Sequence, residues 1–162
     1  MKNMKQQIFT FVFILAATIT GYSQFDDKGY KGLKLGMTYE EASNIAEIDI
    51  AQDDTAITLY DNLKFDLTFA SNSNDEYVLF TMKTSYKDAK LDGVSQNLIG
   101  KTLSEVKAIL GDKLAPFEDA GPGSPYHIYY KNKSAKTNYD SSCMLEFNNA
   151  GELISIMAGF NP

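Results

Sequence analysis

The sequence feature that most constrains this chain is a helix-start motif that occurs twice, at 35–45 and at 99–109. Glycine, threonine, glutamate and isoleucine recur in both copies at one separation of 64 residues, the distance from Gly36 to Gly100. Threonine followed three residues later by glutamate is the pattern of a capping box. There the Thr hydroxyl accepts from the N3 amide and the Glu carboxylate accepts from the cap amide. The repeat therefore predicts two amphipathic helices, each beginning directly after a loop glycine.

Strand-like segments follow each helix start. In 63–69, apolar and polar residues alternate, which is typical of a sheet with one buried and one exposed face. Asp61 and Asn62 precede it as a two-residue hairpin turn. The sequence thus predicts an α+β fold of two tandem helix-plus-antiparallel-sheet units. The expected helices cover 38–47 and 102–110, the expected strands 56–60, 63–69, 77–84, 126–131, 143–147 and 153–157, and the segments 24–31 and 48–54 are expected to be irregular.

The N-terminal segment has the three parts of a secretory signal peptide. Two lysines supply a positive start, and residues 8–17 form an apolar run. Gly21 and Ser23 then occupy the −3 and −1 positions of a cut before Gln24. The run is shorter than the roughly 20 residues that a membrane-spanning helix needs. We therefore expect residues 1–23 to be a signal peptide, and the product to be periplasmic or secreted, without a membrane anchor after cleavage.

Removal of this segment leaves residues 24–162, a length typical of one domain. It leaves 13 basic and 21 acidic residues, and therefore a net charge of −8 instead of the −6 of the whole chain. Such a chain repels the phosphates of a nucleic acid and the surface of an anionic membrane, so a basic protein is an easier partner. The charged connector 86–96 is the expected boundary between a first unit at 24–90 and a second unit at 91–162.

The chain shows no catalytic signature. Its only cysteine, Cys143, alternates with Leu145 and Phe147 on one strand face, which favours a buried apolar role over that of a nucleophile. His127 is the only histidine, so nothing suggests the three or four convergent ligands that zinc requires. A hydrolase that combines His127 with Cys143 or a distant serine is a further alternative. The sequence predicts no enzyme, no catalytic residue, no metal and no cofactor.

The repeated Gly-x-Thr-x-x-Glu helix start leads to a Leu-x-Phe hairpin at 67–69 and again at 145–147. This combination resembles the small envelope domains of the β-lactamase-inhibitor-protein and BamE-like (SmpA/OmlA) type. The resemblance implies helices packed on a small antiparallel sheet, and two such units in tandem that offer a concave sheet surface to an enzyme. The chain lacks the disulfides of the inhibitor protein and the lipidated cysteine of the BamE-like lipoproteins. The resemblance therefore implies an architecture and a habit of binding proteins, without a named partner.

The richest candidate for a binding surface is the aromatic segment at 126–131. In an extended strand neighbouring residues face opposite ways, so the less buried face displays tyrosine rings with polar tips. Tyrosine suits interfaces because it offers a large area and a hydroxyl at a low entropic cost. Ordinary strand composition is the alternative, because tyrosine also has a high β propensity. The predicted partner-binding residues are Tyr126, His127, Tyr129, Tyr130, Lys131 and Tyr139.

These features together predict an exported, soluble, non-catalytic module that presents a sheet surface to a protein partner in the envelope or outside the cell. An inhibitor or immunity protein of an envelope enzyme or toxin is one form of this hypothesis. The alternative is a periplasmic carrier that holds a small apolar ligand or a peptide between its helices and its sheet.

Overall fold

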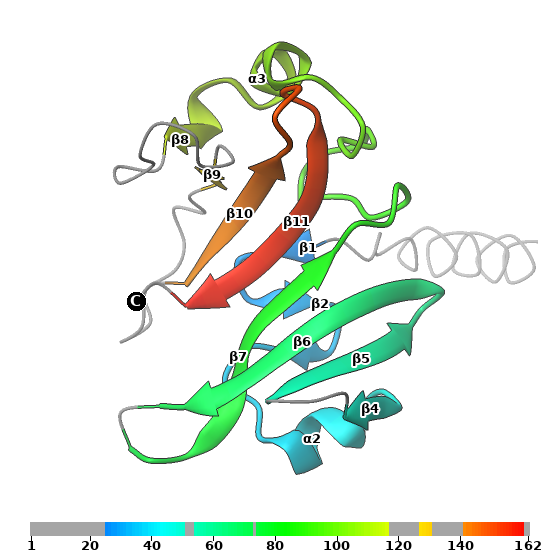
Figure 1. Cartoon of the computed structure of the whole chain (residues 1–162), viewed down its shortest axis with the longest axis vertical. Coiled ribbons are helices and arrows are strands. Elements are labelled where there is room, and N and C mark those ends of the chain that lie inside the picture. The colour runs from blue at the N-terminus through cyan, green and yellow to red at the C-terminus, as the bar shows by residue number, and fades with distance from the viewer. Residues whose placement is uncertain (1–24, 51–53, 73, 117–126, 131–140, 161–162) are drawn as a thin grey trace, which may run out of the picture.

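A computed structural model describes residues 25–50, 54–72, 74–116, 127–130 and 141–160, and the account below refers to these residues (Figure 1). Most of them lie in antiparallel strands that form one small and one large sheet. The elements in chain order are β1 (Phe25–Asp26), β2 (Gly29–Tyr30), β3 (Leu33–Lys34), α2 (Tyr39–Ser43), β4 (Ile48–Ile50), β5 (Thr55–Tyr60), β6 (Leu63–Ser71), β7 (Tyr77–Thr84), α3 (Leu103–Leu110), the 3₁₀ turn η1 (Gly111–Lys113), β8 (Leu114–Pro116), β9 (His127–Tyr130), β10 (Ser141–Phe147) and β11 (Leu153–Phe160).

The large sheet has eight strands in the order β4-β5-β6-β7-β11-β10-β9-β8. Strands β4 to β7 follow one another as a meander, and β8 to β11 form a second meander that enters the sheet from its other edge (Figure 1). The two meanders join where Thr81–Thr84 of β7 pairs with Ile156–Gly159 of β11. The small sheet, in the order β1-β2-β3, lies on one face of the large one.

The predicted fold of two tandem helix-plus-sheet units is therefore wrong. The chain is mainly β, its described helices are short, and the two halves share one continuous sheet instead of building one sheet each. The reason is the pairing of β7 with β11, since each strand would otherwise be an exposed sheet edge. One apolar cluster extends from Phe25 to Ala158 under the whole sheet.

Both predicted capping boxes form. The amide of Glu41 donates to the Thr38 hydroxyl at 3.3 Å, and the Thr38 amide donates to the Glu41 carboxylate at 2.8 Å. Helix α3 has the same box at Thr102 and ends, as predicted, at Gly111 with a φ of +53°. Helix α2 ends at Ser43 instead of near residue 47, and part of the expected acidic loop becomes β4 because it pairs with β5. Within the described residues, no helix is long and apolar enough to cross a membrane.

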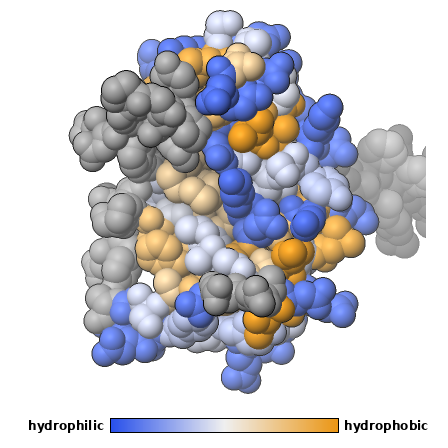
Figure 2. All heavy atoms as spheres, viewed as in Figure 1, coloured by the Kyte–Doolittle hydropathy of each residue, from blue (hydrophilic) through white to orange (hydrophobic). Residues whose placement is uncertain are grey.

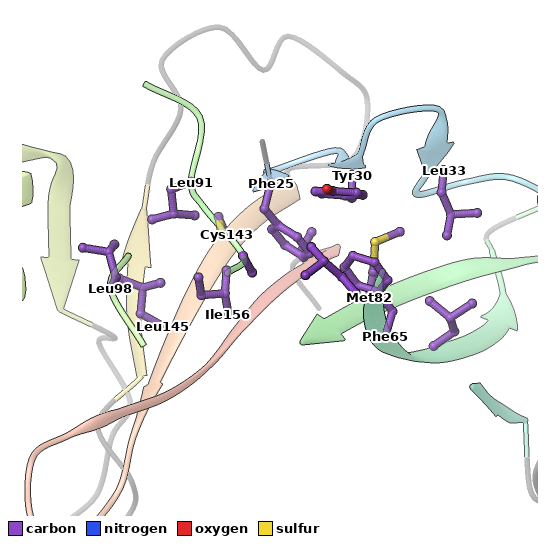
Figure 3. Packing of buried hydrophobic residues seen from close by; sticks show 14 of the residues in the cluster. Phe25, Tyr30, Leu33, Phe65, Met82, Leu91, Leu98, Cys143, Leu145 and Ile156 are labelled. Atoms are coloured by element: carbon purple, nitrogen blue, oxygen red, sulfur yellow. The ribbon is translucent and has the colours of Figure 1, made fainter. Parts of the chain in front are cut away.

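The segment 24–31 was expected to be irregular, but its described residues contribute to the core. Phe25 is fully buried, its amide donates to the carbonyl of Lys90 at 2.7 Å, and it bridges Leu91 in parallel. Its ring stacks on Phe65 of β6 with the centroids 6.1 Å apart. Figure 3 shows the two side chains in the same cluster. The connector expected at 86–96 likewise packs inward, with Ala89 and Leu91 fully buried. Both segments are held because their apolar side chains complete the covered face of the sheet.

Candidate protein-binding face

The two faces of the large sheet differ in what covers them. On β6, Phe65 and Leu67 point into the core, while Lys64 and Asp66 between them are exposed. The core side is covered by the small sheet and by the apolar sides of the helices, which contribute residues such as Ala42 and Val106. The opposite side, here called the open face, looks toward the viewer in Figures 1 and 2. Side chains of many strands lie together on it.

Strand register aligns one residue of every strand in a single row across the open face. Neighbouring members are direct antiparallel partners, so their positions belong to the same face of the sheet. The middle of the row consists of half-buried methionines and a lysine, and its first end is exposed. The row reads Asp49, Ile57, Asp66, Lys83, Met157, Met144, Tyr129 and Ala115.

A second row beside it is made of small residues, and hydroxyl side chains dominate it. The row reads Thr55, Thr68, Thr81, Gly159 and Ser142. A Cβ atom added to Gly159 would lie 3.3 Å from Thr81 Cγ2 and 3.4 Å from Met144 Cε, so the Met144 methyl group extends over the glycine. Figure 2 shows pale atoms over the middle of this face, with both hydrophilic and hydrophobic side chains around them. Methionines beside small residues can repack against differently shaped partners.

An ion pair crosses the centre of the open face. Lys83 Nζ lies 2.6 Å from Glu146 Oε2, and the Ser155 hydroxyl donates to the same carboxylate oxygen at 2.6 Å. Lys83 and Glu146 retain 39% and 23% of their side-chain exposure, so solvent screening limits this pair to about 1 kcal/mol or less of stability. Its main effect is to fix the direction of one positive and one negative group on the surface.

The sequence-predicted binding residues meet this face only in part. The register sets His127 opposite Glu146 and Tyr129 opposite Met144, so both positions belong to the open face. Tyr130 is set opposite Cys143, whose side chain is buried, and its position therefore belongs to the covered face. The other three predicted residues, Tyr126, Lys131 and Tyr139, lie outside the described residues.

Sequence reasoning missed the centre of the face. Met144, Met157 and Thr81 lie at the polar or half-buried positions of strands whose alternation was otherwise recognised. The signal was available in principle, since the residues between the buried ones must share the other face. The register between β7 and β11 could not be predicted in this way, because it joins segments more than 70 residues apart in the chain.

The chemistry of Cys143 supports the predicted buried role. Its side chain is fully buried, and burial, followed by the nearby charges of Asp27 and Asp26, raises the pKa of the thiol well above its usual range. The nucleophilic thiolate is therefore disfavoured. The register also pairs His127 with Glu146, which lies three residues along β10 from Cys143. The position of His127 therefore belongs to the opposite face of the sheet from Cys143.

Two further observations bear on what the face can do. Among the described residues, no group of three or more His, Cys, Asp or Glu side chains is arranged to hold a metal ion. No family model, curated protein or solved structure matches the chain. The inference of function therefore depends on the geometry and composition of the open face itself.

Proposed function

We propose that this protein is an exported, non-catalytic binding module that presents the open face of its large sheet to a protein partner. The observation that carries the proposal is the pair of neighbouring rows across the sheet, in which Met144 and Met157 lie beside small residues, with the Lys83–Glu146 ion pair and exposed carboxylates next to them. Protein interfaces combine such an adaptable apolar centre with a polar rim. An inhibitor or immunity protein of an envelope enzyme or toxin is the specific form that we favour.

Three properties of the sequence support the same proposal. The signal-peptide pattern at 1–23 supports export to the periplasm or beyond the cell. The acidic net charge disfavours nucleic acid and anionic lipid as partners. The short helix-start motifs resemble those of envelope proteins of the β-lactamase-inhibitor-protein type, which grip an enzyme with a sheet surface.

The proposal is tested by placing a charge at the centre of the open face. Met157→Glu replaces an apolar side chain beside Met144 and Lys83 with a carboxylate, so we expect capture of the partner from an envelope extract to fall by about tenfold or more, the effect of a lost central contact. Tyr129→Ala should also weaken capture, since this position lies in the same row. Capture is quantified by affinity isolation followed by mass spectrometry of the recovered proteins.

The matched control is Ala108→Glu, which adds the same carboxylate at an exposed position of α3, away from the sheet. It should leave capture unchanged. Equal capture by Met157→Glu and Ala108→Glu would contradict the proposal, provided that circular dichroism shows both variants to be folded. A small molecule that co-purifies stoichiometrically in native mass spectrometry would instead favour a carrier.

A further inference from the structure

One end of the large sheet carries an unusual number of exposed apolar side chains, with Ile57 and Leu59 on the open face and Ile50, which pairs with the buried Ala56, on the other face. Among the described residues, six large hydrophobic side chains are exposed, and Ile50, Ile57 and Leu59 of β4 and β5 are three of them. Ile50 and Leu59 retain 69% and 66% of their exposure. With Asp49, which pairs with Ile57, these residues form what we call the β4–β5 corner. Clustered apolar exposure of this kind marks interaction sites.

The corner is also an end of the large sheet. Strand β4 is first in the strand order and pairs with β5 alone among the described strands. The Tyr39 hydroxyl donates to the carbonyl of Ile48 at 3.3 Å, so α2 lies at the beginning of β4 (Figure 1). The rest of the strand, Asp49 and Ile50, offers main-chain groups to which an extended segment of another chain can pair.

The charge along this part of the chain is one-sided, and the nearest basic residue is Lys64, which pairs with Leu59 on the side of the corner away from β4. Between residues 35 and 63 there are seven acidic residues and no lysine or arginine. Some acids have internal roles: Glu41 completes a helix cap, Asp61 pairs with Lys31, and the Tyr77 hydroxyl donates to Asp54. Among the described residues, no ion pair involves the exposed side chains of Glu40, Glu47 and Asp49. In the open-face row, Ile57 lies directly between Asp49 and Asp66.

We infer that the β4–β5 corner receives an extended basic segment of the protein partner, in which lysine or arginine alternates with apolar residues. This inference rests on the proposed function and names the partner chemistry at one end of the open face. A basic residue opposite Asp49 forms a favourable cross-strand pair on the open face, and its apolar neighbours point to the other face of the sheet, where Ile50 is exposed. A second copy of this chain is a poor occupant, because antiparallel pairing of two β4 strands about their centres sets Asp49 against Asp49.

The experiment uses a nine-residue peptide of alternating lysine and valine as the probe, titrated calorimetrically into the purified protein. The probe should bind, and Asp49→Lys should weaken binding by about tenfold or more, because like charges then face each other across the pair. The matched control Asp88→Lys makes the same charge change at an exposed position of the connector and should leave binding within about twofold. Ile50→Ser, a change at an exposed side chain on the face that the valines occupy, should weaken binding without disturbing the fold.

Two modified peptides separate strand pairing from simple charge attraction. A glutamate-valine peptide should not bind, and a lysine-valine peptide with alternate amides methylated should bind at least about tenfold more weakly, since it cannot complete the ladder. The inference would be overturned if the methylated peptide bound as tightly as the unmodified one, or if Asp49→Lys left binding of the unmodified peptide unchanged. Failure of the unmodified peptide to bind would overturn it as well. Partner capture that is lost in Met157→Glu but kept in Asp49→Lys would overturn this inference while the proposed function stands.

Discussion

At the scale of single residues, the helix caps show how a local pattern becomes a measurable charge effect. The carboxylate of Glu105 accepts from the Thr102 amide at 2.8 Å and from the Thr102 hydroxyl at 2.7 Å. The backbone hydrogen bond, and after it the hydroxyl bond, lowers the pKa of Glu105 from its ordinary value of 4.5. The ionised carboxylate is therefore the form that the folded helix start prefers.

The first prediction concerns this carboxylate and pH. Because the pKa of Glu105 is lower in the folded chain than in the unfolded chain, its stabilisation is complete above pH 4.5 and disappears as the pH falls through the folded value. Glu105→Gln should thus lower the free energy of unfolding near neutral pH and have little effect in strong acid. Urea denaturation at several pH values measures the free energy of unfolding of the wild type and of the variant under both conditions. Asp88→Asn, which removes an exposed carboxylate outside the helix caps, is the control. A pH-independent loss in Glu105→Gln would contradict the argument.

At the scale of elements, each helix start is fastened to a hairpin in the same way. The Gly36 amide donates to the carbonyl of Leu79, and the Leu79 amide donates to that of Met37, at 2.9 and 2.7 Å. In the second half, the Gly100 amide donates to the carbonyl of Leu153 and the Leu153 amide donates to that of Lys101, both at 2.8 Å. The hairpin tips also match. Asn72 and Asn148 each accept hydrogen bonds from two backbone amides on the side-chain oxygen, and each donates from its side-chain nitrogen to the carboxylate of a glutamate four residues later. The repeated sequence therefore encodes a joint between helix and hairpin.

The second prediction concerns the turn between β5 and β6. Asp61 and Asn62 have φ values of +53° and +63°, which confirms the two-residue hairpin turn predicted from the sequence. Asn62→Ala should lower the free energy of unfolding by about 1 kcal/mol, because alanine tolerates left-handed backbone poorly. Asn62→Gly should change it by less than about 0.5 kcal/mol. Chemical denaturation measures the change for both variants, and Asn97→Ala, at an exposed position just after the connector, is the control. Equal losses for alanine and glycine would show that the side chain of Asn62, and not its backbone, matters.

At the scale of the whole molecule, one core unites segments from both halves. Figure 3 shows Phe25, Tyr30 and Leu33 of the small sheet facing Phe65 and Met82, with Leu91, Leu98, Leu145 and Ile156 continuing the same layer. Because Phe25 of β1 forms a bridge with Leu91, β1 is tied to the connector between the halves. Neither half buries its apolar surface without the other.

The third prediction follows from this shared core. The intact chain should unfold in a single cooperative transition, with the same midpoint by near- and far-ultraviolet circular dichroism. Fragments 24–90 and 91–162, produced separately, should show no cooperative unfolding of their own. Two resolved transitions in the intact chain, or a folded isolated fragment, would restore the idea of two independent units that the continuous sheet contradicts.

The sequence by itself determined the local features of this protein. Both capping boxes, the glycine that ends α3, the turn at 61–62 and the burial of Cys143 were predicted, because each depends on residues a few positions apart. The alternation of apolar residues likewise located most strands of the large sheet. The candidate site was predicted only where β9 could be recognised as a strand, at His127 and Tyr129.

Only the tertiary structure decided how these pieces combine. The pairing of β7 with β11 made one sheet where two had been expected, and it brought Lys83, Met157 and Met144 into one row. The short strands β1 to β4 contain too few residues for a periodic pattern, and they form because pairing and burial against distant segments stabilise them. Register between distant strands is set by the summed burial of a whole face, a quantity that no short stretch of sequence contains.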